Sequence, residues 1–445
     1  MVEKKSSLPI RILKAVFKPD YIYCTILVFL FMVGIRQLVE KFSFLNPIET
    51  ALSDFEMTDI VFSAGIREAP SLDTNIVLVN FGNLSRRGIA REIEIIAAQK
   101  PKVVGIDCSF RVLKKEEDDS LLAEAMSKID NLVLYSKLDY SDHSKSDEFD
   151  TLLYCHPKFA QHGSSGFCNL ITPGQDEYLT CRTFKPVDSV RGHIENAFAV
   201  EIAAHIDREK TEKFLSRKKD VEIINFRGNK DYFYSLDVTD LLGHDDGSGF
   251  IQEPELNISL KDKIVIMGFM GENFGPSSDL TREDKFHTPI NKKYAGKAYP
   301  DMFGVVVHAN IVSMVLNDAP MNTMSEWGSL LLAVFLCYLN VIFFFYIHDY
   351  YPSWYDLVVK TMQVLEVLLI LGAAVIIYAN YNYSMDVTIA AVAVGLCGDI
   401  LEVYTGAMYN IVVRLRDRIK LILFQKQPLV VTSKENQDSS PTDHG

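Results

Sequence analysis

The chain has 445 residues, of which 48% are hydrophobic, and its formal net charge at pH 7 is −13. This acidic balance argues against a nucleic-acid-binding surface, because phosphate binding needs clustered Lys and Arg. The length allows two or three ordinary domains. The hydrophobic residues gather near the N-terminus and in a block from Trp327 to Val413, and this uneven distribution indicates a membrane protein.

The first hydrophobic run begins at Tyr21 and predicts a membrane-spanning helix over residues 21–41. Its uncharged part ends before Arg36, so a cleaved signal peptide is the alternative. No small-residue cleavage site follows, and a helix whose Arg36 and Lys41 snorkel reaches the roughly twenty residues that a bilayer requires. We therefore expect an uncleaved signal anchor after a cytoplasmic N-terminus of residues 1–20.

Residues 42–326 mix charges, turns and short hydrophobic runs, as a folded domain outside the membrane does. In the first half, three strand patterns alternate with two helical patterns, at residues 75–81, 88–100, 102–110, 118–129 and 131–138. The second half adds a helical pattern and two strand patterns, at residues 194–206, 221–226 and 263–271. This alternation indicates an α/β domain with a parallel, helix-covered sheet in two or more lobes.

The C-terminal hydrophobic block predicts three more transmembrane helices, at residues 327–347, 357–378 and 385–406, with Tyr and Trp crowding the breaks. Basic residues precede the first span and follow the fourth: Lys4, Lys5, Arg11, Lys14, Lys18, Arg414, Arg416, Arg418 and Lys420. Because cytoplasmic segments carry such charges, we expect both termini inside and the α/β domain outside. Residues 407–445 should form a basic amphipathic helix and a disordered tail.

The order of several segments resembles the second type of CHASE domain, an extracellular sensory module associated with cyclases and histidine kinases. The segments are the strand ending at Asn80 and Phe81, the strand with Asp107, the acidic pair Asp118 and Asp119, the motif Phe226 to Gly228, the strand Asp262 to Gly268, Thr288 and Pro289, and the closing motif with Gly304, Val305, His308, Ala309 and Asn310. The arrangement of one span and then three adds to the resemblance.

The chain departs from the family pattern at two places. Asn80 stands where the family usually has Asp, and the Trp- and Pro-rich segment that follows in the family is reduced here. Family members commonly continue into a cyclase, kinase or phosphatase domain, whereas only a short tail follows the fourth span. A charge-dependent role at Asn80 is therefore in question, and the output domain is either lost or supplied by another chain.

The resemblance implies a receptor-like protein of a bacterial inner membrane. Its outer domain would sense a ligand or a protein, and its spans would relay the change to a separate cytoplasmic or membrane partner, with a homo-oligomer as an option. We expect no enzymatic activity and no cofactor. The alternatives are a structural or assembly subunit of an envelope complex and a transporter subunit, the latter supported only by acidic residues within the spans.

Five residues are candidates for ligand contact: Asn80, Asp107, Gly268, His308 and Asn310. Asp107 ends a predicted parallel strand, where open α/β sheets place ligand-contacting residues, although such an Asp also caps helices. Gly268 opens a glycine turn that resembles an anion-binding loop, but the spacing and the Lys of a phosphate loop are absent.

His308 and Asn310 should lie in the first turn of a helix. His308, and His287 beside Asp279, Glu283 and Asp284, could be drawn into a metal or acid–base site. Neither spacing matches a zinc or hydrolase pattern, and we expect structural roles for both histidines and no metal site.

Cys155, Cys168 and Cys181 lie between hydrophilic loops, and an oxidising compartment would permit one disulfide among them. Three pairings are open. Cys155 and Cys168, with His156 and His162, could instead bind a soft metal, but a turn-rich insertion with a disulfide or free thiols is the preferred interpretation.

Three acidic residues lie in the predicted spans without an evident partner: Glu366 in the third, and Asp399 and Glu402 in the fourth. Intramembrane acids are costly, so a functional or packing role is expected. We expect them to be protonated or to meet a basic residue in a partner's span. Snorkelling of Glu366 and Glu402 to the inner interface is the alternative.

Overall fold

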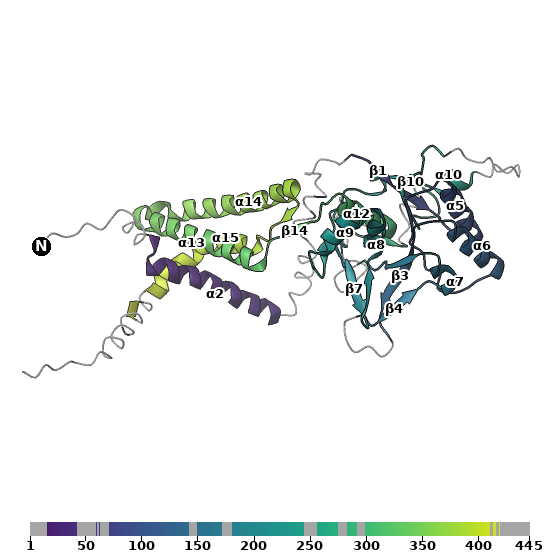
Figure 1. The fold of residues 1–445 in the computed structure, drawn as a ribbon. Helices are drawn as coiled ribbons and strands as arrows, with labels where there is room; N and C mark the ends of the chain where they lie inside the picture. Colours follow the sequence, from purple (N-terminus) through teal and green to yellow (C-terminus); the bar gives the residue numbers. More distant parts are fainter. Residues whose placement is uncertain are drawn as a thin grey trace, which may run out of the picture. The chain divides into compact units, whose positions relative to one another are not determined.

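The computed structural model describes residues 16–41, 59, 62, 71–141, 149–170, 180–243, 256–274, 283–291, 299–409, 413, 414 and 418. The chain divides into two compact units (Figure 1). The helical unit comprises Met1–Lys41, Trp327–Ile370 and Val387–Gly445, and the α/β unit comprises Phe42–Glu326 and Leu371–Asp386. The predicted basic helix and tail lie almost entirely outside the described residues.

The α/β unit is built on a seven-stranded sheet in the order β10-β1-β11-β2-β3-β4, with β5 also paired to β3. Its strands are β1 (Asp73–Asn80), β2 (Val103–Ile106), β3 (Leu132–Asp139), β4 (Thr151–Tyr154), β5 (Ser164–Phe167), β10 (Phe233–Leu236) and β11 (Ile264–Gly268). Within this sheet, β4 runs antiparallel to β3 and the other pairings are parallel. The carboxyl ends of the parallel strands therefore meet at one edge.

Helices cover both faces of this sheet (Figure 1). Alternate residues of β1 point to opposite faces: Val77 and Val79 pack under one helical layer, and Ile76 and Leu78 under the other. The first layer holds α5 (Arg86–Ala98) and α6 (Glu116–Met126), and the second holds α8 (Phe198–Ile206), α9 (Arg208–Leu215) and α12 (Gly304–Leu316). The two-sided cover explains why these strands are continuously apolar.

Shorter elements surround this core. They are α7 (Pro157–Ala160), β6 (Thr183–Phe184), β7 (Val187–Val190), β8 (His193–Asn196), β9 (Glu222–Ile223), η3 (Lys230–Tyr232), α10 (Val238–Leu242), β12 (Lys285–Phe286) and β13 (Met302–Phe303). Among them, β6 pairs with β9, β7 with β8 and β12 with β13.

The predicted α/β class with a helix-covered, largely parallel sheet is confirmed, and two local predictions are wrong. Residues 221–226 give only the two-residue strand β9 beside β6, because the backbone amide of Asn225 donates to the Met314 Sδ at 3.3 Å and not to a neighbouring strand. Residues 194–196 belong to β8, and the predicted helix begins only at Phe198. The described strands form one main sheet rather than separate large lobes.

Helix α12 is the most deeply buried helix of the α/β unit, with every residue from Gly304 to Val315 buried. It begins four residues before His308, so His308 and Asn310 lie beyond the expected first turn. A Cβ on Gly268 of β11 would come within 2.7 Å of the Val305 Cβ. Glycine at position 268 therefore allows α12 to pack closely on the sheet.

Two segments that are distant in sequence form a small parallel pair within the α/β unit. These are β14 (Asn322–Thr323), which follows α12, and β15 (Tyr383–Ser384), which follows α14. The amide of Asn322 donates to the Asn382 carbonyl at 2.9 Å, and the amide of Met324 donates to the Ser384 carbonyl at 2.9 Å. The pair joins the end of the α/β fold to the loop between α14 and α15.

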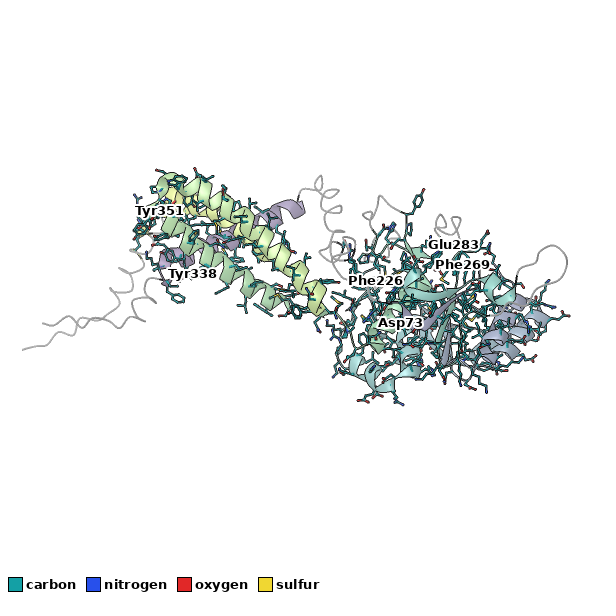
Figure 2. The ribbon with its side chains drawn as sticks, turned by 90° about the horizontal axis from the view of Figure 1, so that it is seen from above. Asp73, Phe226, Phe269, Glu283, Tyr338 and Tyr351 are labelled. Atoms are coloured by element: carbon teal, nitrogen blue, oxygen red, sulfur yellow. The ribbon has the colours of Figure 1, made fainter. Side chains whose placement is uncertain are left out.

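The helical unit contains α2 (Pro19–Lys41), α13 (Glu326–Tyr350), the 3₁₀ turn η4 (Pro352–Trp354), the first part of α14 (Tyr355–Tyr381), α15 (Thr388–Val403) and the π-helical turn η5 (Tyr404–Met408). Among the described residues, four helical segments are long and apolar enough to cross a membrane. The Tyr338 hydroxyl donates to the Val16 carbonyl at 2.9 Å, and the Tyr355 hydroxyl donates to the Gly398 carbonyl at 3.1 Å (Tyr338 labelled in Figure 2).

Candidate functional site

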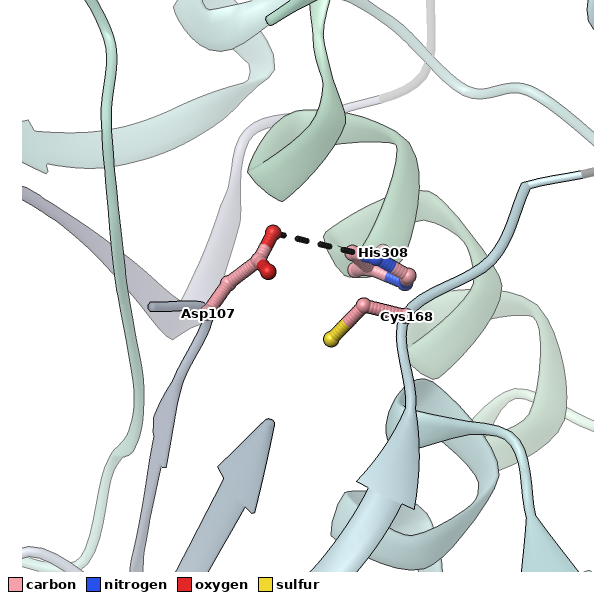
Figure 3. A group of neighbouring side chains, drawn as sticks. All are labelled: Asp107, Cys168 and His308. Carbon is pink, nitrogen blue, oxygen red and sulfur yellow. Dashed lines mark ion pairs between the residues drawn. The ribbon is translucent and has the colours of Figure 1, made fainter. Parts of the chain in front are cut away.

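Three chemically reactive side chains converge at the carboxyl edge of the sheet (Figure 3). Asp107 follows β2, Cys168 follows β5, and His308 lies on α12. Because β2 and β5 both run parallel to β3, their carboxyl ends lie at the same edge, and α12 brings His308 across it. The ligand-type atoms of the three residues all lie within 4.8 Å of one another. We call this group the Asp107–Cys168–His308 cluster.

The cluster is largely closed from solvent. The His308 Nε2 lies 3.8 Å from the Asp107 Oδ2, which is too long for a hydrogen bond, and the two side chains are 3% and 13% exposed. The His308 ring also contacts the Phe198 ring edge-on, with 5.2 Å between centroids. Asp284, which is exposed, contributes a second carboxylate: a Cβ on Gly304 would lie 3.7 Å from its Oδ1 and 3.9 Å from the Asp107 Oδ2.

Burial dominates the electrostatics of this cluster. It raises the pKa of Asp107 to about 7, with a further rise from the negative charge of Asp284 and an opposing effect from the Cys168 thiol. It also raises the pKa of Cys168 well above its usual value, and the Asp107 carboxylate adds to that rise. Burial lowers the pKa of His308 to about 4, opposed by the nearby Cys168 backbone. The imidazole is therefore neutral at pH 7.

Asn80 lies at the same sheet edge, but its side chain forms hydrogen bonds within the protein. Its amide donates to the Asp237 Oδ1 at 2.8 Å and to the Gly271 carbonyl at 3.0 Å. Its carbonyl oxygen accepts from the amides of Gly82 at 3.0 Å and Met270 at 2.8 Å. All four hydrogen-bonding positions of this buried side chain are occupied, so the geometry indicates that Asn80 organises the loops after β1 and β11 rather than contacting a ligand.

Asn310 has an equivalent role on α12. Its oxygen accepts from the amides of Arg227 at 2.8 Å and Gly228 at 3.3 Å, and its nitrogen donates to the carbonyls of Gly228 and Val306. The family-like motif Phe226 to Gly228 is thus held by Asn310. Together with the packing role of Gly268, this leaves Asp107 and His308 as the two sequence-derived candidates that the fold brings together.

The predicted thiol site has a different arrangement. All seven cysteines are free, so none of the three disulfides considered for Cys155, Cys168 and Cys181 is formed. Cys155 is buried with its Sγ 3.4 Å from the Tyr135 carbonyl, and His156 caps α7 by accepting from the Lys158 amide at 3.2 Å. Among the described residues, Cys168 joins Asp107 and His308 rather than Cys155 and the two neighbouring histidines.

The acidic residues of the predicted spans have polar neighbours within this chain, and it stays a prediction that they are protonated or meet a basic residue of a partner's span. Asp399 of α15 forms an ion pair with Lys360 of α14. Asp356 lies near Glu402, and Asn340 lies near Glu366, whose Oε2 has no hydrogen-bond partner among the described residues. Sequence spacing could not reveal these contacts, because each joins two different helices.

Cys168 and Asp284 are the site residues that sequence reasoning did not assign to this edge. Like Asp107, Cys168 directly follows a strand of the main sheet, here Ser164–Phe167. That strand was not predicted, because its Ser-rich sequence has a weak β pattern.

The sequence places Asp284 beside His287. In the structure, the pairing of β12 with β13 brings residue 284 to the start of α12, next to Asp107. The Gly304 amide donates to the Asp284 carbonyl at 3.0 Å.

Comparison with known proteins adds the family. No curated protein and no solved structure matches this chain. The family model described as the CHASE2 domain matches residues 26–342, which include the Asp107–Cys168–His308 cluster and the whole described sheet. The family that the order of the sequence motifs suggested is thereby confirmed, and the chain belongs to the CHASE2 domain family of extracellular sensory domains.

Proposed function

We propose that this protein is a membrane receptor-like subunit of a bacterial inner membrane. In this proposal, the α/β unit lies outside the membrane and binds a ligand at the Asp107–Cys168–His308 cluster. The four long apolar helices cross the membrane and pass the change to a separate cytoplasmic or membrane partner. The chain itself catalyses no reaction.

The observation that carries the proposal is the course of α12. The helix holds His308 near one end and is buried along nearly its whole length of roughly 20 Å. Only a short segment, which includes β14 (Asn322–Thr323), separates the end of α12 at Leu316 from the start of α13 at Glu326. A shift of α12 on ligand binding would therefore be transmitted along a packed, rigid element towards the first C-terminal span.

The segment after α12, residues 317–323, is itself held in place, which suits a relay. Arg217 donates to the carbonyl of Met321 at 2.8 Å and to the side chain of Asn322 at 3.0 Å. Asn225 donates to the carbonyl of Ala319, and β14 pairs with β15. Movement of this segment would thus reach both α13 and the α14–α15 loop.

Hydrogen exchange of the purified full-length protein tests the relay. His308→Gln should change amide exchange in residues 317–323 and 382–386, while His193→Gln, at an exposed histidine of β8, should leave both segments unchanged. Equal exchange in the wild type and His308→Gln would contradict the relay, provided that thermal unfolding shows both variants folded.

Purification of the tagged protein from native membranes, with mass spectrometry of what accompanies it, tests the partner. A co-purifying kinase, cyclase or regulator supports a receptor. Stoichiometric recovery of envelope components under all conditions would instead favour a structural or assembly subunit.

A further inference from the structure

We propose that the Asp107–Cys168–His308 cluster is a binding site for a divalent transition-metal ion, with zinc as the best match. The inference names the ligand class of the site used in the proposed function and rests on it for its signalling consequence, but the site itself can be tested separately.

The donor set points to this class of ion. A thiolate, an imidazole nitrogen and a carboxylate oxygen are the three side-chain types that bind Zn²⁺ in proteins, whereas Ca²⁺ and Mg²⁺ prefer oxygen alone. Two of the three donors directly follow strands of the main sheet, and the third lies on a buried helix. A site anchored by strands and a helix keeps its geometry better than one within long loops.

The spacing is close to that of a coordination shell. Ligands at the usual zinc bond lengths of about 2.0–2.3 Å lie roughly 3.3–3.8 Å apart in a tetrahedron. The His308 Nε2 and the Asp107 Oδ2 are 3.8 Å apart, and all three donor atoms lie within 4.8 Å of one another.

A further acidic side chain lies near the cluster. A Cβ on Gly304 would lie 3.7 Å from the Asp284 Oδ1 and 3.9 Å from the Asp107 Oδ2. Asp284 is therefore an acidic neighbour that would attract a cation towards the three donors.

Binding would release protons from the cluster, because the thiol of Cys168 must ionise to coordinate. No bond to carbon or change of oxidation state is involved. The site therefore needs no co-reactant, and its occupancy can be measured directly with the metal alone.

Cobalt(II) provides a direct test, because a cysteine thiolate bound to Co²⁺ gives a near-ultraviolet charge-transfer band. The full-length protein, purified in detergent with a non-histidine tag and a phosphine reductant, would be titrated with Co²⁺ and then with Zn²⁺. We expect one Co²⁺ per chain with a thiolate band, and displacement of Co²⁺ by Zn²⁺.

Matched variants identify the ligands. Cys168→Ser should abolish the thiolate band, and Asp107→Asn and His308→Gln should each weaken metal binding by at least about tenfold. Cys181→Ser removes a fully buried thiol elsewhere in the same unit and should leave the band unchanged. Absence of the band in the wild type, or its persistence in Cys168→Ser, overturns the metal site; metal-free melting curves identify any variant that fails to fold.

The outcome separates this inference from the proposed function. Stoichiometric, Cys168-dependent Co²⁺ binding with no change of exchange in residues 317–323 would keep the metal site and contradict the relay. A change of exchange in those residues on His308→Gln, without metal binding by the wild type, would keep the relay and overturn the metal site.

Discussion

Asn322, just after the buried helix α12, pairs in parallel with Tyr383, in the loop between the two last apolar helices. Two backbone hydrogen bonds flank this pair, from the amides of Asn322 and Met324. The end of the α/β fold is therefore joined to a loop about sixty residues further along the chain. The strength of this pairing can be tested by removing one hydrogen-bond donor.

Met324→Pro removes the amide that donates to Ser384, whereas Met324→Ala keeps it. We expect Met324→Pro to raise hydrogen exchange at Asn322 by about fivefold, which corresponds to the roughly 1 kcal/mol of one hydrogen bond. The measurement is exchange mass spectrometry of the peptide that contains Asn322. An equal increase in Met324→Ala would show that the side chain, and not the hydrogen bond, holds the segment.

Gly268→Ala should destabilise the α/β unit, because the new methyl group would overlap Val305 of α12, whose Cβ lies 2.7 Å away. Overpacking of this kind costs about 1–3 kcal/mol. Val305→Ala keeps the Cβ but removes the two methyl groups that would lie 2.9 and 3.3 Å from the new Cβ, so the double variant should lose less stability than the two single changes added together. Denaturant unfolding of the four proteins measures this coupling, and strict additivity would show that the two residues do not compete for space.

Glu92 makes stability depend on pH. This buried side chain of α5 has no hydrogen-bond partner for either oxygen among the described residues. Burial, with a smaller effect of Asp237, raises its pKa to about 8. Between the ordinary pKa of 4.5 and this value, the folded state holds a proton that the unfolded state has lost. The stabilisation from neutral Glu92 is thus complete below about pH 4.5 and is lost as the pH rises through about 8.

Glu92→Gln should flatten that pH dependence. The gain in the free energy of unfolding should be largest at about pH 8 and above, up to a few kcal/mol, and the melting temperature should rise with it. The control is Glu94→Gln on the same helix, because Lys128 holds the pKa of Glu94 below its usual range. Glu94 affects the pH dependence with the opposite sign. The stability that ionised Glu94 contributes is present above its ordinary pKa of 4.5 and is lost as the pH falls through its lowered pKa in the folded state. Melting curves from pH 5 to pH 9 that stay parallel in the wild type and Glu92→Gln would contradict the buried-acid interpretation.

The ion pair between Lys360 and Asp399 joins α14 to α15. Asp399→Asn leaves Lys360 unpaired in a helix that we propose crosses the membrane, and should lower the stability of the detergent-solubilised protein by about 1 kcal/mol or more. Exchanging the two residues, as Lys360→Asp with Asp399→Lys, should restore most of the loss. Thermal unfolding in detergent measures both changes, and failure of the exchanged pair to recover stability would show that the contact does not depend on charge complementarity.

Much of the architecture could be predicted from the sequence, because the signals involved are local. The apolar strands around Val77, Val104 and Val265 and the amphipathic helix around Ile93 carry their own hydrophobic periodicity. The position of Asp107 at a strand end follows from the same pattern. The long apolar stretches likewise mark the four helices of the described residues that are long and apolar enough to cross a membrane.

Only the tertiary structure decides which of these local features meet. The strand β11 enters the sheet between β1 and β2, although it comes much later in the chain, and so places Gly268 beside Asn80. Parallel pairing then brings Cys168 to Asp107, and α12 brings His308 to both. Such contacts depend on the order of strands and on the packing of a helix across them, and hydrophobic periodicity, which reports only whether a residue faces inwards or outwards, carries no record of its partner.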